Sequence, residues 1–287
     1  MEALLSTIEK YRRFIAESHT LGSGMAQSCV TAINKLERAL HEAQMLPIED
    51  SLWNICDIGY LVRLYEIVKK EQKKADGGIF RNEQAKSYWQ RGFCSAALKQ
   101  LAQFVSLKAR EDIMLQKMAT ATDGKQLGKN LAAIPLAANP LLIADDIDIS
   151  SAEGKTALRE VEVRQNQYVF RKIVLENYQY HCCLTGLPIP EILRASHISE
   201  WAKDKDNRLN PENGLCLSAT YDAAFDRHLI SFDDDYRMIL APSLREYYTN
   251  QTFQEQFKHF EGTRITLPIR FLPSKDLLAK HRENLLC

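Results

Sequence analysis

Residues 182–232 read CCLTGLPIPEILRASHISEWAKDKDNRLNPENGLCLSATYDAAFDRHLISF, and this stretch decides the fold of the C-terminal part of the chain. A run of apolar and polar residues that ends at His197 predicts a β-strand. After a charged loop and a Pro-Glu-Asn-Gly turn at 211–214, the apolar residues 215–217 predict a second strand. A helix is expected from Ala219. The stretch therefore predicts a β-hairpin followed by a helix.

Each of these elements carries one group that can take part in hydrolysis. His197 ends the first strand, Asn213 follows it by 16 residues at the turn, and Asp222 follows Asn213 by 9 residues in the helix. Asp226 lies one helical turn after Asp222. A general base, an amide that orients it and a carboxylate that holds a cation together form a hydrolytic site.

The stretch resembles the HNH nuclease domain, or ββα-metal fold, in the branch that has Cys-x-x-Thr-Gly before the first histidine. The resemblance covers most of residues 160–287, from a helix before the hairpin to His-Arg-Glu-Asn at 281–284. The residues that carry it in the central stretch are Ala195, Ser196, His197, Ile198, Trp201, Arg208, Leu209, Pro211, Asn213, Gly214, Leu215, Leu217, Ser218, Asp222, Phe225, Asp226, Arg227, Leu229, Ile230, Ser231 and Phe232.

The resemblance implies a role for each position of the motif. His197 is expected to be the general base that activates water against a phosphodiester, and Asn213 to hold the hairpin and the base in register. Asp222 takes the third position, where many relatives have His or Asn, and is expected to bind the cation. The fold class that follows is α+β, with an N-terminal all-α domain before a C-terminal ββα-metal nuclease domain.

Two positions depart from the family pattern. Ser196 stands where many HNH nucleases have an aspartate that is the second metal ligand, so the ligand set is incomplete and Asp226 or water has to be considered. His228 replaces the usual glycine after Asp226-Arg227, which predicts a strained or differently shaped turn if the backbone there has a positive φ. Asp226 is equally open to a structural role beside Arg227 or Arg171.

The expected cofactor is a divalent cation, with Mg²⁺ as the first choice and Mn²⁺ or another transition metal as alternatives. Some HNH relatives hold a structural zinc with two Cys-x-x-Cys pairs. The seven cysteines of this chain form no such pair, so we expect no structural zinc.

Four basic residues are candidates for contact with nucleic-acid phosphates. Arg164, Arg171 and Lys172 precede the hairpin within the matched region, and ordinary charge on a helix surface is the alternative. Arg208 lies in the hairpin loop, where neighbouring aspartates balance the basic residues.

Composition narrows the class of protein. The chain has 287 residues, with 37 Lys and Arg against 37 Asp and Glu, which argues mildly against tight non-specific binding of nucleic acid. No apolar run approaches the roughly 20 residues that span a bilayer, and the charged N-terminus lacks the apolar core of a signal peptide. Scattered cysteines, odd in number, fit a reducing cytoplasm. We expect a cytoplasmic protein without a membrane partner.

The expected domains are a helical domain at 1–118, a connector rich in small residues and proline at 119–153, and the nuclease domain at 154–287. A fragment that begins near Ser151 should then fold alone. The expected elements are helices at 2–19, 25–43, 58–73 and 82–117 with a break near 106–107, a short helix at 129–134, an extended segment at 160–164, a helix at 167–179, a hairpin of 229–232 and 238–240, a helix at 244–260, a strand at 265–267 and a closing helix at 274–285.

The function expected from these features is metal-dependent hydrolysis of DNA by an HNH endonuclease. The helical domain faintly resembles the N-terminal regions of restriction and phage-defence nucleases, so a defence role with partner proteins is an analogy. Two alternatives stay open: an HNH fold that binds nucleic acid without catalysis, motivated by Ser196, and a nuclease that cleaves RNA. The oligomeric state is not indicated.

Overall fold

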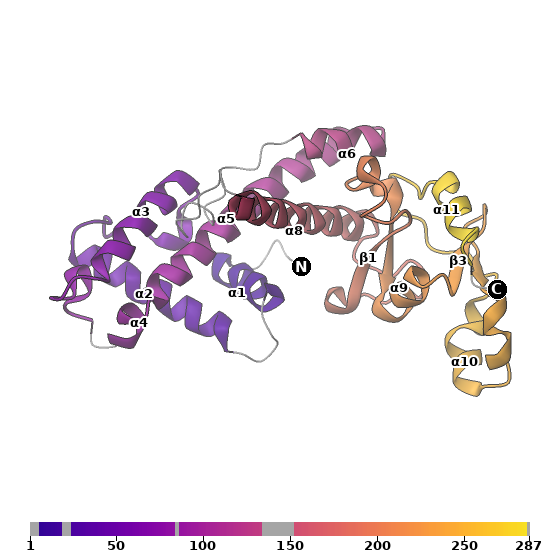
Figure 1. Cartoon of the computed structure of the whole chain (residues 1–287), viewed down its shortest axis with the longest axis horizontal. Coiled ribbons are helices and arrows are strands. Elements are labelled where there is room, and N and C mark those ends of the chain that lie inside the picture. The colour runs from indigo at the N-terminus through magenta and orange to yellow at the C-terminus, as the bar shows by residue number, and fades with distance from the viewer. Residues whose placement is uncertain (1–5, 19–23, 84–85, 134–151, 286–287) are drawn as a thin grey trace. The chain divides into compact units, whose positions relative to one another are not determined.

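The structure is a computed structural model that describes residues 6–18, 24–83, 86–133 and 152–285. The described residues form two compact units. Unit 1 contains those up to Ala109 and the start of the helix at 152–161, and unit 2 contains the residues from Arg110 and those from Glu162 onward. The fold class is α+β, as expected, with helices in the N-terminal part and small sheets in the C-terminal part (Figure 1). No helix of the described residues has the length and apolar character to cross a membrane.

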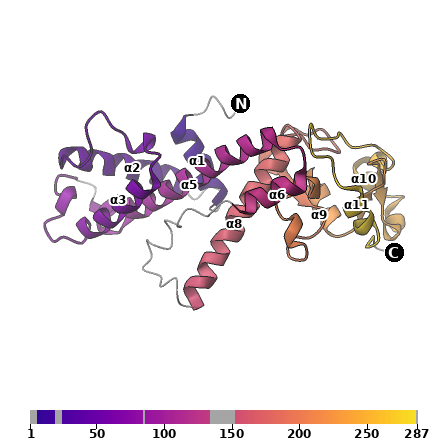
Figure 2. The same ribbon diagram turned by 90° about the horizontal axis from the view of Figure 1, so that it is seen from above.

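Unit 1 consists of helices (Figure 2). Their buried apolar side chains form one core. Asp57 caps one of them, because its carboxylate accepts the backbone N–H of Tyr60 at 3.1 Å. The core includes the fully buried Tyr11, Ile33 and Leu98. The helices are α1 (Thr7–Ser18), α2 (Met25–Glu42), α3 (Ile58–Glu71), α4 (Lys86–Gln90) and the first part of α5 (Phe93–Thr120), with 3₁₀ turns at Leu52–Asn54 and Gly78–Phe80.

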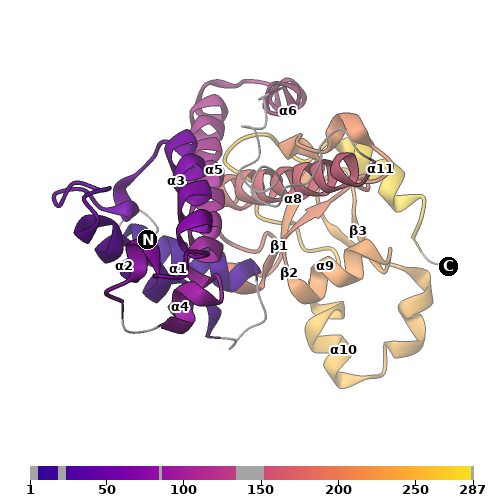
Figure 3. The ribbon, with the colours of Figure 1, turned by 60° about the vertical axis from the view of Figure 1, so that its left-hand side comes forward.

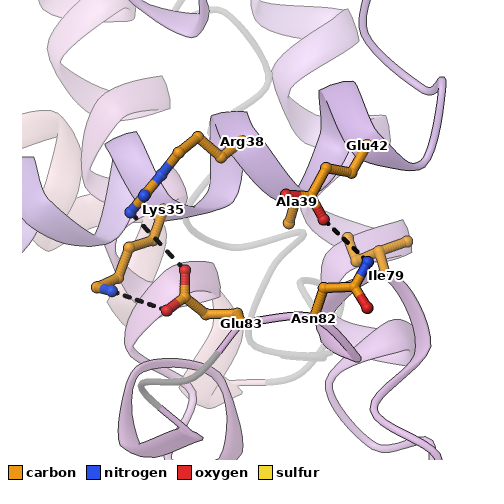
Figure 4. A pocket seen from close by; sticks show the side chains of 7 residues that line it. All are labelled: Lys35, Arg38, Ala39, Glu42, Ile79, Asn82 and Glu83. Atoms are coloured by element: carbon orange, nitrogen blue, oxygen red, sulfur yellow. Dashed lines mark hydrogen bonds and ion pairs between the residues drawn. The ribbon is translucent and has the colours of Figure 1, made fainter.

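A pocket in unit 1 lies between α2 and residues 79–83 (Figure 4). Its charged side chains have partners within the pocket. Glu83 forms ion pairs with Lys35 at 2.9 Å and Arg38 at 3.8 Å, and Asn82 donates a hydrogen bond to Glu42 at 3.1 Å. The pocket is therefore close to electrically neutral.

Two long helices differ from the sequence expectation. The predicted break near 106–107 is wrong, since α5 is continuous to Thr120. The helical segment is interrupted earlier, at Gly92 between α4 and α5, where the backbone has a φ of 76°. The predicted extended segment at 160–164 is also wrong. These residues belong to α8 (Ala152–Asn177), and alternation over five residues is too short to separate a strand from a helix.

The helix α6 (Gly124–Ala132) forms part of the core of unit 2. Leu127 and Leu131 are buried in the same cluster as Met114 and Met118 of α5 and as the hairpin residues. The guanidinium of Arg270 donates to the backbone carbonyls of Met118, Ala119 and Ala121, where α5 ends. The short helix expected near 129–134 therefore begins earlier and is packed.

The predicted hairpin and helix are present in unit 2 (Figure 3). Strands β1 (Leu193–His197) and β2 (Gly214–Ser218) pair antiparallel, with His197 opposite Gly214 and Leu193 opposite Ser218. Helix α9 (Ala219–Asp226) follows β2 directly and packs on both strands. The connection contains 3₁₀ turns at Lys205–Asn207 and Pro211–Asn213.

The C-terminal elements complete unit 2. The second predicted hairpin is confirmed, with β3 (Ile230–Phe232) paired to β4 (Met238–Leu240), and the closing helix is α11 (Lys275–Arg282). The helix expected over 244–260 is instead a 3₁₀ turn at Pro242–Tyr247, helix α10 (Gln251–Gln256) and a turn at Lys258–Phe260. The strand expected at 265–267 reduces to a single bridge between Arg264 and Arg237.

Candidate functional site

The hairpin, its loop and α9 form one pocket of about 380 Å³. It contains all the predicted motif side chains except that of Asn213, which lies buried behind it. The described residues that line it include no lysine or arginine, so its charged groups are carboxylates. The lining residues are Ala195, Ser196, His197, Ile198, Glu200, Trp201, Asp222, Asp226, His228 and His281.

His197 is held on three sides. Its imidazole stacks on Phe170 of α8 with ring centroids 3.6 Å apart, and Trp201 contacts it edge-on at 5.4 Å. Its Nε2 lies 3.1 Å from the carbonyl oxygen of Arg208. A carbonyl only accepts, so Nε2 carries the proton and Nδ1 is the basic nitrogen. Among the described residues Nδ1 has no hydrogen-bond partner.

Burial sets the protonation state of this histidine. Desolvation lowers the pKa of His197 from 6.5 to about 4, against the opposing effect of the bond to Arg208. The imidazole is therefore neutral at pH 7, as a general base must be.

Gly214 permits the stacking on His197. It lies opposite His197 in the hairpin, and a Cβ there would come within 2.4 Å of Val174 and 3.0 Å of Phe170. Because Gly214 has no side chain, α8 can approach the hairpin and place Phe170 against the imidazole. The sequence indicated only a turn at this position.

Asn213 closes the loop between the two strands. Its side chain is fully buried, accepts the backbone N–H of Ser199 at 2.7 Å and donates to the carbonyls of Ser199 and Asn207, each at 3.1 Å. Its own carbonyl accepts the N–H of Ile198 at 2.9 Å. The amide thus fixes the backbone that follows His197, and its role in holding a catalytic base in register stays a prediction.

Ser196 and the two aspartates form the acidic side of the pocket. The Ser196 hydroxyl donates to Asp222 Oδ1 at 2.5 Å, which orients that carboxylate. Partial burial and the nearby charge of Asp222 raise the pKa of Asp226. Two carboxylates that repel each other in this way are a suitable environment for a cation.

His228 lies at the end of α9 with a φ of 53°. The N–H of Leu229 bonds to the Ala224 carbonyl and the N–H of His228 to the Phe225 carbonyl, each at 2.9 Å. This is a Schellman cap, whose left-handed residue is most often glycine. The turn with positive φ is therefore present with a histidine in it, and the buried Nδ1 of His228 has no hydrogen-bond partner among the residues that the structure describes.

Sequence reasoning assigned no role to three residues that lie at the site. Phe170 and Trp201 contact His197; Trp201 is among the residues that carry the resemblance, and Phe170 lies in the helix before the hairpin that the resemblance also covers. His281 stacks on Phe225 at 3.8 Å, and its nitrogens bond the Ser231 hydroxyl at 3.0 Å and the Phe225 carbonyl at 3.2 Å. Its place in the His-Arg-Glu-Asn signature was the only signal in the sequence.

The four candidate phosphate contacts do not gather in the pocket. Arg171 donates to the carbonyls of Leu193 and Pro190, and Lys172 pairs with Glu111 at 3.4 Å. Arg208 donates to the Trp201 carbonyl at 2.8 Å and lies over the Trp201 ring. Arg164 is exposed on α8. Arg171 and Arg208 thus bond to the backbone of the hairpin region and Lys172 bonds to α5, and contact of any of the four with nucleic acid stays a prediction.

The donors in the pocket fit a hard divalent cation. Mg²⁺ commonly binds one or two carboxylates and completes its shell with water and substrate phosphate, and Asp222 and Asp226 offer these carboxylates. His228 also lines this pocket, although its Nδ1 is buried. Within the described part of the chain, no three His, Cys, Asp or Glu side chains form a preassembled metal site.

Comparison with known proteins agrees with this geometry. Residues 182–233 match the model of a family described as HNH endonuclease. No curated protein matches the chain. The matched segment contains β1, β2, α9 and β3 and carries His197, Asn213 and Asp222. HNH nucleases generally use a divalent metal ion. The C-terminal part of this chain therefore carries an HNH endonuclease domain, which indicates a nuclease with a nucleic-acid substrate.

Proposed function

We propose that the chain is a metal-dependent endonuclease that hydrolyses DNA phosphodiester bonds with His197 as the general base. The observation that supports this most is the state of His197. It is neutral, its Nε2 proton is held by the Arg208 carbonyl, and it lines one pocket with Asp222 and Asp226. A base with a fixed tautomer beside a cation site is what phosphodiester hydrolysis requires.

Each residue has a distinct part in this proposal. His197 Nδ1 takes the proton of the attacking water, and Phe170 and Trp201 keep the ring from rotating. Asn213 holds the backbone after His197, and Asp222, oriented by Ser196, would hold the cation together with Asp226. A bound divalent cation would neutralise charge on the scissile phosphate and leaving oxygen.

The acidity of the pocket supports the need for a cation. A phosphodiester is an anion, and Glu200, Asp222 and Asp226 would repel it from a pocket without lysine or arginine among its described lining residues. Mg²⁺ is the first choice for two carboxylates, with Mn²⁺ or another transition metal as alternatives.

The test is a cleavage assay with supercoiled plasmid in Mg²⁺, in Mn²⁺ and in chelator. Cleavage that needs the metal and disappears in His197→Ala supports the proposal. A folded wild-type protein that binds DNA but cleaves nothing in any metal would favour the alternative motivated by Ser196, an HNH fold without catalysis. Parallel digestion of RNA and DNA of equal length separates the remaining alternative, an RNA-cleaving nuclease.

The biological role belongs to the same proposal. A nuclease domain joined to a helical unit fits restriction or phage defence in the cytoplasm, where unit 1 would select the substrate through DNA or a partner protein. Cleavage of modified and unmodified DNA by the purified chain tests this role, because a restriction function predicts that one of the two substrates is preferred.

A further inference from the structure

Helix α6 lies outside the matched segment and packs against the loop that holds His197. It contacts the 3₁₀ turns at Lys205–Asn207 and Pro211–Asn213. Its buried face consists of Gly124, Leu127, Gly128 and Leu131. Both glycines face the loop, so its backbone approaches that of the loop directly.

Gly128 makes the closest of these contacts. A Cβ at this position would come within 2.9 Å of the Asn210 nitrogen, 3.0 Å of the Leu209 carbonyl carbon and 3.1 Å of the Asn210 Cα. These are backbone atoms, which cannot rotate away as a side chain could. Any side chain at 128 therefore has to displace the loop or the helix.

The start of α6 adds a second contact. The N–H of Gly124 donates to Glu212 Oε1 at 3.1 Å, so Glu212 satisfies one of the free amides at the beginning of the helix. A Cβ at Gly124 would lie 2.7 Å from Asn210 Oδ1 and Glu212 Cγ. The first turn of α6 thus packs closely against the 3₁₀ turn that precedes β2.

Hydrogen bonds within the loop connect these contacts to His197. They are made by the side-chain amides of Asn207, Asn210 and Asn213, which are spaced three residues apart. The side chain of Asn207 accepts from Asn210 at 2.9 Å and donates to Asp204 at 2.7 Å, and the Asn207 carbonyl accepts from Asn213. Arg208 lies within this hydrogen-bonded segment, and its backbone carbonyl accepts the hydrogen bond from His197 Nε2–H.

We infer that α6 is a positioning element for the general base, acting through the contact of Gly128 and Gly124 with the loop at 205–213. The inference rests on the proposed role of His197. It assigns a part in the reaction to residues before the nuclease motif, with Gly128 as the principal positioning residue. The expected consequence is that a side chain at 128 moves the Arg208 carbonyl away from the imidazole.

The direct readout is the Nε2 proton of His197 in the full-length ¹⁵N-labelled protein. A proton bonded to a buried carbonyl exchanges slowly with water and gives a resolved imidazole N–H signal. His281 supplies an internal reference, because its Nε2 proton bonds the Phe225 carbonyl at 3.2 Å, away from α6. Histidine variants assign the two signals.

In Gly128→Ala the His197 signal should disappear or shift while the His281 signal stays. The kcat for plasmid cleavage should fall by about 100-fold, the order expected for a misplaced catalytic group. KM and the affinity for Mn²⁺, measured by electron paramagnetic resonance, should stay unchanged. Lys129→Ala is the matched control, since Lys129 neighbours Gly128 on the exposed face, and it should alter none of these quantities.

A folded Gly128→Ala protein with the wild-type His197 signal and kcat would overturn the inference. If both imidazole signals vanish, Gly128→Ala has unfolded. The variants Glu212→Ala and Glu212→Gln then test whether α6 positions His197. The alanine variant should shift the His197 signal and lower kcat several-fold, while glutamine keeps an acceptor for Gly124 and should restore both. Wild-type behaviour of Glu212→Ala would then reject the role of α6.

The failure of this inference is distinct from failure of the proposed function. If the wild-type protein cleaves no nucleic acid, the proposed function fails, yet the imidazole signal still reports whether α6 holds the histidine. If the wild type cleaves and the signal ignores Gly128, only the role of α6 fails.

Discussion

Two histidines of unit 2 have similar surroundings but differ in the number of hydrogen-bond partners of their ring nitrogens. His197 stacks on Phe170 and His281 stacks on Phe225, and burial lowers the pKa of each to about 4. His281 has a partner on both nitrogens, Ser231 and Phe225, whereas His197 has one described partner, Arg208. Burial and pKa therefore do not distinguish these two histidines, whereas the nitrogen of His197 that has no described partner does.

The largest expected effect separates the two histidines by activity. His197→Ala should lower kcat for plasmid cleavage by roughly 1,000-fold, within the range for loss of a general base. His281→Ala should lower kcat of the folded protein by less than about tenfold, because both its nitrogens serve the fold. Single-turnover cleavage at saturating Mg²⁺ measures both. Equal losses in the two variants would remove the distinction.

The second effect concerns the carboxylates beside His197. Asp222→Ala should lower cleavage by about 100-fold or more across a metal titration, since a ligand that stabilises the phosphate charge supplies several kcal/mol. Asp226→Ala should match that loss if it replaces the ligand missing at Ser196, or lose less if it only orients the cation. Wild-type activity of Asp222→Ala would contradict the cation site, with circular dichroism as the control for folding.

The third effect separates the histidines by stability. His281→Ala should lower the free energy of unfolding by about 2–3 kcal/mol, because it leaves the buried Ser231 hydroxyl without its described partner and removes a buried, stacked ring. His197→Ala leaves only the Arg208 carbonyl unpaired and should cost less. Urea unfolding of both variants gives the comparison, and a greater loss in His197→Ala would reverse it.

The fourth effect is a pH dependence that the two histidines share. Each has a folded pKa of about 4 and an ordinary value of 6.5, so between these values the unfolded chain binds more protons. Stability should be complete above pH 6.5 and fall as pH drops toward 4, by roughly 1 kcal/mol per histidine at pH 5.5. Replacing either histidine with Gln should remove about half of this slope, and an unchanged slope would reject the assignment.

The smallest effect is on the pH profile of catalysis. From the ordinary pKa of histidine the sequence predicts loss of activity below about pH 6.5. Burial of His197 revises this, because the base stays neutral until pH approaches 4. We expect kcat to change little between pH 7 and about pH 5, measured on protein shown to be folded at each pH. A fall centred near pH 6.5 would indicate that His197 is solvated in the complex.

The division of the chain bears on how these experiments are built. Met114, Met118, Leu127 and Leu131 belong to the core of unit 2, so a fragment that begins near Ser151 would lack four of its buried side chains. A fragment from Arg110 keeps them. We propose that unit 1 selects the substrate or regulates cleavage. Comparing the cleavage activity of the fragment from Arg110 with that of the full chain tests this.

The motif residues and the local elements around them could be read from the sequence. The apolar pattern of the strands, the Pro-Glu-Asn-Gly turn and the helix start predict the hairpin and helix that carry His197, Asn213 and Asp222, because these are local signals. The second hairpin and the closing helix follow from the same kind of signal. Adjacent residues determine such features, so no knowledge of the rest of the chain is needed.

Only the tertiary structure decided what surrounds His197. Phe170 reaches the imidazole because Gly214 has no side chain, and α6 reaches the loop because Gly128 has none. The sequence left Arg171 and Lys172 open between phosphate contact and ordinary helix-surface charge, and in the structure Arg171 donates to the Leu193 carbonyl and Lys172 pairs with Glu111. These contacts join segments far apart in the sequence, and a local pattern does not contain the distance between them. The sequence by itself therefore determined which residue is the candidate base, and the packing decided its tautomer, its charge and its support.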